Sequence, residues 1–309
     1  MQLKFYSPAE AFAAIAILVM YTDGRTSVKE LNIILKNFSS QPLGVLTFID
    51  SSDLFNLFLE TKNKILKTFN RNPARDELVV FNGEEVDSLI FASKRILSED
   101  LRETAYFLAA ELAYVDEFTA LEKNILDKIR NEFEIYRTTA DMIMEIVPIK
   151  YRIPKNSEIK TKQKSKYNLQ NAAEAIIGIQ LAIVFADKDV SMKQTSNMFW
   201  NLTLLNIFSN KSTEYYYETK YKILNIFDKH LDKPVPFSEV EINNLIIECK
   251  EVMEPKIRET ALWVATELAY TTGMNEYEIE LLDKLIQGME IDLNVAEKIS
   301  QVIPIKFRT

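Results

Sequence analysis

The chain has 309 residues, of which 47% are hydrophobic and 27% charged, and its formal net charge is −8 at pH 7. This length predicts two domains, each with enough apolar residues for a packed core. A single histidine and a single cysteine exclude a zinc site, a disulfide framework and a redox pair. The six glycines lie in no phosphate-binding motif, and the acidic charge argues against a nucleic-acid partner.

Helices are predicted along the whole chain. Apolar residues recur at the three-four spacing of an amphipathic helix over residues 9–22, 53–69, 101–115, 121–133, 171–186, 192–208 and 214–230. Residues 77–83 have mild strand character, and we interpret them as a loop or a short extended insert. The predicted fold class is all-α, with about six or seven helices in each half.

Membrane insertion is not expected. The longest apolar run, residues 11–21, is shorter than the roughly 20 residues that a membrane-spanning helix needs. The first eight residues carry one lysine and no small-residue cleavage site, so no secretory signal is legible. We therefore expect a cytoplasmic protein that is not an integral membrane protein, and we leave open a peripheral position at a membrane.

Self-comparison predicts a tandem duplication. Residues 102–152 match residues 258–308 without a gap at a shift of 156 positions, and both stretches end in Pro-Ile-Lys, an aromatic residue and Arg. Upstream, Glu10-Ala11 matches Glu174-Ala175 at a shift of 164, so the first copy is eight residues longer. The predicted domains are residues 1–152 and 169–309.

A basic linker separates the two copies. Residues 153–168 contain five lysines, among them Lys160, Lys162 and Lys164, against one glutamate. One interpretation is a solvated tether that its own charge keeps extended. The other is a contact for an anionic membrane surface or an acidic protein partner.

Four predicted helix-turn-helix joints share a capping signature. Each has Ser, Thr or Asn followed three residues later by Glu or Gln: Ser27 and Glu30, Thr119 and Glu122, Ser191 and Gln194, Asn275 and Glu278. In a capping box the first side chain accepts from the backbone of the new helix and the second reaches back to the cap N–H. A leading Asp or Gly suits a chain that leaves the previous helix through a left-handed turn.

The alternative function of these joints is binding of a divalent cation such as calcium or magnesium. The candidate ligands are Asp23, Glu30, Asp116, Glu122, Asp187 and Asp189. Their spacing departs from that of an EF-hand loop, and the fourth joint lacks a leading acid. Capping accounts for all four joints, whereas a metal accounts for at most three.

Residues 21–30, Tyr-Thr-Asp-Gly-Arg-Thr-Ser-Val-Lys-Glu, lie at the end of an apolar helix and beyond it, and a similar pattern recurs about 90 residues later. This arrangement resembles the TerB-like domain of tellurite-resistance and related stress proteins. Both halves show it, although the second departs from it at Lys188 and Gln194. The resemblance implies an all-helical module that acts with protein partners, is linked to metal binding and membrane-associated stress complexes, and has no established catalytic reaction.

Two further repeated features carry charge. Arg102-Glu103 recurs as Arg258-Glu259, with Glu111 and Glu267 further along. We interpret these as an arginine paired to a carboxylate between packed helices, and a paired-carboxylate hydrolase is the remaining enzyme hypothesis.

In the stretches 147–152 and 303–308, proline is predicted to end the helix before a short extended segment. That segment is expected to pack on its own domain, or else to dock into a partner's groove.

Three single features complete the prediction. His230 is expected at a solvated helix end, and Cys249 as a small buried residue. A helix cannot bury Tyr215, Tyr216 and Tyr217 on one face, so at least one of them is expected at the surface or at an interface. The leading hypothesis is a non-enzymatic adaptor or scaffold for protein partners, and the alternative is a cation-responsive binding protein.

Overall fold

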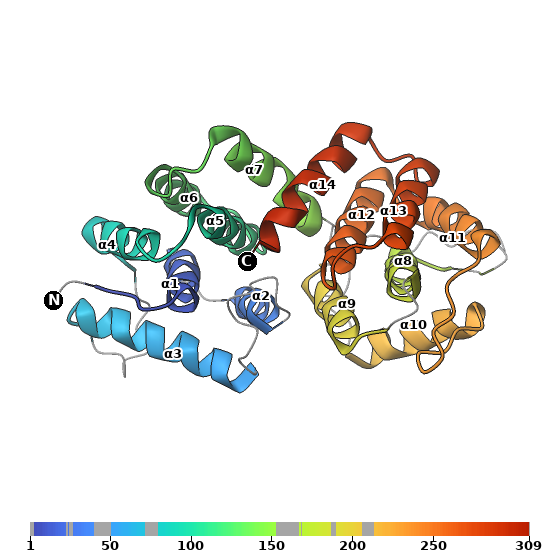
Figure 1. Ribbon diagram of the computed structural model, residues 1–309, viewed down its shortest axis with the longest axis horizontal. Coiled ribbons are helices and arrows are strands. Elements are labelled where there is room, and N and C mark those ends of the chain that lie inside the picture. Colours follow the sequence, from blue (N-terminus) through green and yellow to red (C-terminus); the bar gives the residue numbers. More distant parts are fainter. Residues whose placement is uncertain are drawn as a thin grey trace. The chain divides into compact units, whose positions relative to one another are not determined.

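The computed structural model describes residues 3–22, 24, 27–39, 51–71, 80–152, 167, 169–186, 190–205 and 213–308. Over these ranges the chain forms fourteen α-helices and no strand (Figure 1). The predicted all-α class is confirmed. None of the described helices is both long and apolar enough to cross a membrane.

The chain divides into two compact units. Unit 1 comprises residues 1–148 together with 304–309, and unit 2 comprises residues 149–303. The helices that begin in unit 1 are α1 (Pro8–Met20), α2 (Val28–Ser39), α3 (Ser51–Thr68), α4 (Gly83–Lys94), α5 (Glu99–Tyr114), α6 (Ala120–Glu132) and α7 (Arg137–Tyr151). Those that begin in unit 2 are α8 (Ala172–Ala186), α9 (Met192–Leu204), α10 (Thr213–Ile226), α11 (Glu239–Val252), α12 (Pro255–Tyr270), α13 (Glu276–Gly288) and α14 (Leu293–Lys306).

Each unit is built around one buried apolar helix. In unit 1 this helix is α1, which packs against α3, α4 and α5, and in unit 2 it is α8, which packs against α9 to α13. Figure 1 shows both helices surrounded by their neighbours. All fifteen residues of α8 are buried, as are eleven of the thirteen residues of α1. A helix that is apolar on all sides belongs in a core, because it has no face to offer to water.

The two units exchange the ends of their last helices. Helix α7 begins in unit 1, but its last residues from Ile149 onward belong to unit 2. Helix α14 begins in unit 2, but its residues from Pro304 onward belong to unit 1. We call residues 149–152 and 305–308 the closing segments. The expectation that each closing segment packs on its own domain was wrong.

The conformation of the closing segments also differs from the prediction. Pro148 and Pro304 lie inside α7 and α14, and the helices continue for three and two residues beyond them. Proline was expected to end each helix, because it lacks an N–H and crowds the preceding turn. Helical backbone instead carries the isoleucine and lysine of each segment into the other unit.

Other element ends differ from the prediction in detail. Helix α9 ends at Leu204 and α10 at Ile226, so both are shorter than the periodicity indicated. His230 therefore lies beyond α10, where its side chain is exposed as expected. Of the strand-like stretch 77–83, residues 77–79 lie outside the described residues, residues 80–82 are irregular, and Gly83 begins α4.

Candidate functional site

In each unit, the closing segment from the other half of the chain binds an acidic face of one helix. In unit 1 this face lies on α5, where Glu103 and Glu111 are both buried. In unit 2 it lies on α12, which carries the equivalent Glu259 and Glu267. We call these surfaces the receiving faces of α5 and α12.

The receiving face of α5 holds the segment 305–308 by hydrogen bonds and ion pairs, among them a 3.4 Å ion pair between Arg308 and Asp100. The Lys306 ammonium donates to Glu111 Oε2 at 2.8 Å, and the Thr104 hydroxyl donates to the Ile305 carbonyl at 2.8 Å. Arg308 forms an ion pair with Glu103. From α2, the Asn37 amide donates to the same Glu111 oxygen at 3.1 Å.

The receiving face of α12 holds the segment 149–152 in the same way. The Lys150 ammonium donates to Glu267 Oε2 at 2.9 Å, and the Thr260 hydroxyl donates to the Ile149 carbonyl at 2.6 Å. Arg152 forms an ion pair with Glu259. Every one of these contacts is the counterpart, at the shift of 156, of a contact in unit 1.

The lysine of each closing segment lies in the protein interior. The Lys150 side chain is 0% exposed and its partner Glu267 2%, while Lys306 is 4% exposed and Glu111 1%. Burying an ion is costly unless an opposite charge and further hydrogen bonds compensate for the lost water. Each receiving face therefore favours a segment with a positively charged side chain opposite its buried glutamate, Glu267 or Glu111.

The space beside the unit 1 pair is too small for a substrate. The cavity lined by Asn37, Thr104, Phe107, Leu108, Glu111 and Lys306 leaves about 10 Å³ for a water-sized sphere. That volume holds at most one water molecule. Glu103 and Glu259, around which the hydrolase hypothesis placed a deep pocket, form ion pairs with Arg308 and Arg152.

The neighbouring arginines pair with carboxylates as predicted, since Arg102 lies 3.9 Å from Glu134 and Arg258 lies 3.8 Å from Glu290, and they have a second task as well. Arg102 donates to the Leu97 and Lys94 carbonyls, and Arg258 donates to the Met253 and Lys250 carbonyls. Each arginine thus caps the end of the preceding helix, where carbonyls lack helical partners. The glutamates beside them pair with arginines far away in the sequence.

The lysines and the asparagine of these sites were not among the residues predicted from the sequence. The signal was present, because Lys150 and Lys306 are identical at the shift of 156. Asn37 likewise has an identical, buried counterpart in Asn201 at the shift of 164. A buried polar residue that is retained in both copies of a duplication is a candidate for a shared contact.

The four predicted capping boxes are all present. Ser27 and Glu30, Thr119 and Glu122, Ser191 and Gln194, and Asn275 and Glu278 each bond reciprocally across the start of a helix. Gly24 and Gly273 occupy the left-handed region, with φ of 75° and 89°, in the turns before two of these helices. Two further capping boxes, which were not predicted, start α4 and α11.

Of the six candidate metal ligands, three can be placed. Glu30 and Glu122 accept hydrogen bonds in their capping boxes, and Asp116 is exposed. Asp23, Asp187 and Asp189 lie outside the described residues. Within the ranges that the structure covers, no three His, Cys, Asp or Glu side chains gather closely enough to hold a metal ion.

The tyrosines of α10 form an aromatic cluster with a lysine. Tyr216 is buried against Phe199, with ring centroids 5.2 Å apart, whereas Tyr217 and Tyr221 are 45% and 55% exposed. The Lys220 ammonium lies 5.2 Å from the Tyr217 ring centroid and 5.3 Å from that of Tyr221. Burial lowers the pKa of Lys220. The prediction that at least one tyrosine faces the surface is confirmed, and we call Tyr217, Lys220 and Tyr221 the α10 surface.

Lys160, Lys162 and Lys164, the candidate contact residues of the linker, lie outside the described residues. Tyr215, the remaining candidate partner residue, is partly buried.

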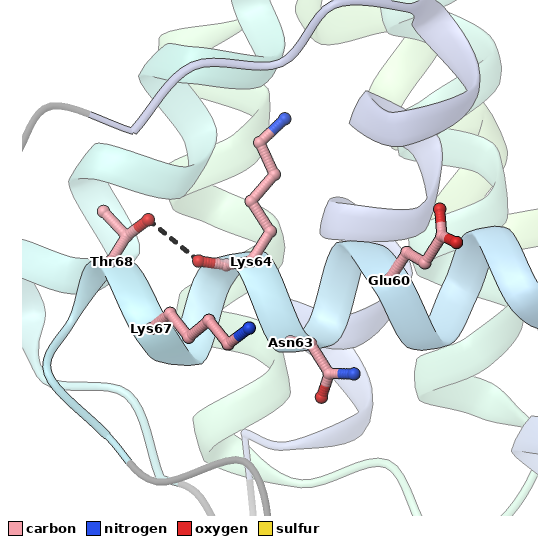
Figure 2. Close-up of a pocket in the computed structure, with 5 residues that line it drawn as sticks. All are labelled: Glu60, Asn63, Lys64, Lys67 and Thr68. Atoms are coloured by element: carbon pink, nitrogen blue, oxygen red, sulfur yellow. Dashed lines mark hydrogen bonds between the residues drawn. The ribbon is translucent and has the colours of Figure 1, made fainter.

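A larger hollow, of about 450 Å³, lies along α3 and does not form a convergent site. Its lining residues are Glu60, Asn63, Lys64, Lys67 and Thr68, all from α3. Figure 2 shows that their side chains point in different directions, and that the Thr68 hydroxyl donates to the Lys64 carbonyl. The Lys64 ammonium pairs with Glu10 at 3.1 Å, which ties α3 to α1.

The chain was compared with known proteins in three ways. No family model, no curated protein and no solved structure matches it. The resemblance to TerB-like domains therefore stays a prediction that depends on the residues quoted for it.

Proposed function

We propose that this chain is a non-enzymatic adaptor or scaffold that binds a protein partner through the α10 surface. In the terms of the TerB-like resemblance, the partner belongs to a stress-related or membrane-associated complex. The single observation that supports the proposal is the exposure of Tyr217 and Tyr221 around Lys220.

The chemistry of the α10 surface is that of a binding surface. Tyrosine is enriched in interface hot spots, because it offers a large rigid ring together with a hydroxyl that can hydrogen-bond. The rings of Tyr216 and Phe199 both pack against the ring of Tyr217. Because this backing holds the ring of Tyr217, a partner can bind to it with little loss of side-chain freedom.

The proposal is tested by recovering the tagged full-length chain from its source cells, with soluble and membrane fractions kept separate. We compare the wild type with a chain carrying both Tyr217→Ala and Tyr221→Ala and quantify the co-purifying proteins by mass spectrometry. Loss of two hot-spot tyrosines is expected to reduce a stoichiometric partner by about tenfold or more.

The matched control carries Tyr136→Ala and Tyr277→Ala. These tyrosines are 67% and 63% exposed, do not belong to α10, and should not affect recovery of the partner. Circular dichroism confirms that both variants keep their helical content. The adaptor proposal is wrong if the wild type recovers no stoichiometric partner, or if the control loses the partner to the same extent.

Binding of a divalent cation stays the alternative prediction for the acidic turns. A cation that binds only the folded chain raises its melting temperature, and a chelator lowers it again. Thermal unfolding with calcium, with magnesium and with a chelator would distinguish this function from the adaptor function.

A further inference from the structure

The exchange of closing segments is reciprocal. Residues 149–152 from the first half complete unit 2, and residues 305–308 from the second half complete unit 1. Reciprocal exchange of an identical element is the arrangement found in a two-fold symmetric, domain-swapped dimer.

We propose that the receiving face of α5 also accepts the segment 305–308 of a second copy of this chain, so that two chains form a closed, exchanged dimer. This self-association goes beyond the adaptor function, which concerns the α10 surface and a different protein. It involves the acidic face of unit 1 and a partner of known sequence.

The contacts that hold the segment do not depend on which chain supplies it. They include the Lys306 pair with Glu111, the Arg308 pairs with Glu103 and Asp100, and the bond from Thr104 to the Ile305 carbonyl. Lys306 and Glu111 are 195 positions apart in the sequence, so no local chain geometry forces them together. A second copy offers the same side chains and the same helical backbone.

The protein concentration decides whether the segment docks within its own chain or into a second chain. Within one chain, the covalent connection gives the segment an effective concentration in the ~mM range, so the monomer dominates in dilute solution. Refolding at high protein concentration allows segments to dock between chains, and each docked segment then has to leave its buried site before the dimer dissociates. We therefore expect exchanged dimers to form on concentrated refolding and to persist on dilution.

Charge reversal gives a direct test with full-length chains. Glu111→Lys and Lys306→Glu are made in separate chains, so that in each variant the segment meets a like charge in its own unit 1. When the two variants are refolded together, both exchanged sites join opposite charges. We expect a one-to-one heterodimer in the mixture, at least tenfold more abundant than the dimers of either variant alone, as measured by light scattering and native mass spectrometry.

Two controls distinguish exchange from general charge attraction. A chain carrying both reversals has its own segment and face matched again, so it should be monomeric. A second mixed pair, Asp87→Lys with Lys128→Asp, reverses an exposed 2.7 Å ion pair of unit 1 that involves no closing segment, and it should also stay monomeric. A heterodimer from this control pair, or its absence from the test pair when both variants are helical, overturns the proposal.

Reversing a buried charge can prevent folding, which circular dichroism would show. In that case the measurement uses two differently tagged wild-type chains, refolded together over a series of concentrations up to ~1 mM. Mixed dimers that survive dilution support the proposal. Monomers alone at every concentration overturn it.

Discussion

At the scale of single residues, the two lysine–glutamate pairs act through the cost of burial. Lys150 and Glu267 are almost completely removed from water, as are Lys306 and Glu111. Replacing a buried ion pair by apolar residues can leave stability unchanged, whereas removing one partner costs about 3–5 kcal/mol. The pairs therefore contribute specificity above all, because a segment without a positive charge leaves a buried carboxylate without that partner.

Cys249 allows a clean test of burial at one residue. Its side chain is 0% exposed, and desolvation raises the pKa of the thiol, with Glu248 acting in the same direction. Thiol reagents attack the thiolate, so the native chain is expected to react about 10³-fold or more slowly than the unfolded chain, at a rate set by opening. The measurement is labelling at pH 8 with and without urea, and Cys249→Ala should show no labelling.

The raised pKa also predicts how Cys249 links stability to pH. Above the ordinary pKa of a thiol, the unfolded state releases this proton while the folded state keeps it, so this contribution to stability falls as pH rises. Equal labelling rates in the native and unfolded chain would contradict the burial of Cys249.

At the scale of elements, capping boxes define where the helices begin. Six boxes occur in the described residues, and each satisfies backbone N–H groups that have no partner within the helix. Glu122 illustrates the consequence for function, since its Oε2 accepts from both the Thr119 N–H and the Thr119 hydroxyl. A carboxylate in this position already has a structural task at the start of α6.

We predict that Thr119→Ala lowers the free energy of unfolding by about 1 kcal/mol, because the first turn of α6 loses its cap. The matched control is Thr138→Ala, an exposed residue in the first turn of α7, for which we expect a change of about 0.5 kcal/mol or less. Urea unfolding followed by circular dichroism measures both. Equal effects of the two substitutions would show that the box at Thr119 adds nothing beyond a loss of side-chain contacts.

At the scale of the whole molecule, the exchange places residues of each repeat in the unit that is formed mainly by the other repeat. Lys150 belongs to the first repeat but pairs with Glu267 in unit 2, and Lys306 belongs to the second repeat but pairs with Glu111 in unit 1. A substitution in one repeat should therefore weaken the unit that is formed mainly by the other repeat.

Tryptophan fluorescence can test this crossing, because the chain has two tryptophans, Trp200 and Trp263, and both lie in unit 2. Lys150→Met leaves Glu267 buried without its lysine. We expect it to lower the free energy of unfolding of unit 2 by about 3 kcal/mol, and with it the urea midpoint measured by fluorescence. Lys306→Met should act mainly on unit 1, seen by circular dichroism, and affect the fluorescence midpoint much less. The opposite pattern, with fluorescence responding to Lys306→Met alone, would rule out the exchange.

Some elements of the candidate site were predictable and others were not, for reasons that depend on sequence distance. The boxes at Thr119 and Asn275 join residues three positions apart, so their residue types are sufficient to recognise them. The exposure of Tyr217 and Tyr221 follows from the geometry of one helix. Lys150 and Glu267 are 117 positions apart, and no local pattern links them.

By itself, the sequence determined the helical class, the duplication, the caps and the burial of Cys249, because each depends on neighbouring residues or on comparison of the chain with itself. Tertiary structure alone decided that α7 and α14 continue past their prolines and carry Lys150 and Lys306 into the opposite units. The physical reason is that the energy of a buried charge depends on which opposite charge the fold brings within about 3 Å. Both repeats have the same lysine and the same glutamate, so only the three-dimensional fold distinguishes pairing within a repeat from pairing between repeats.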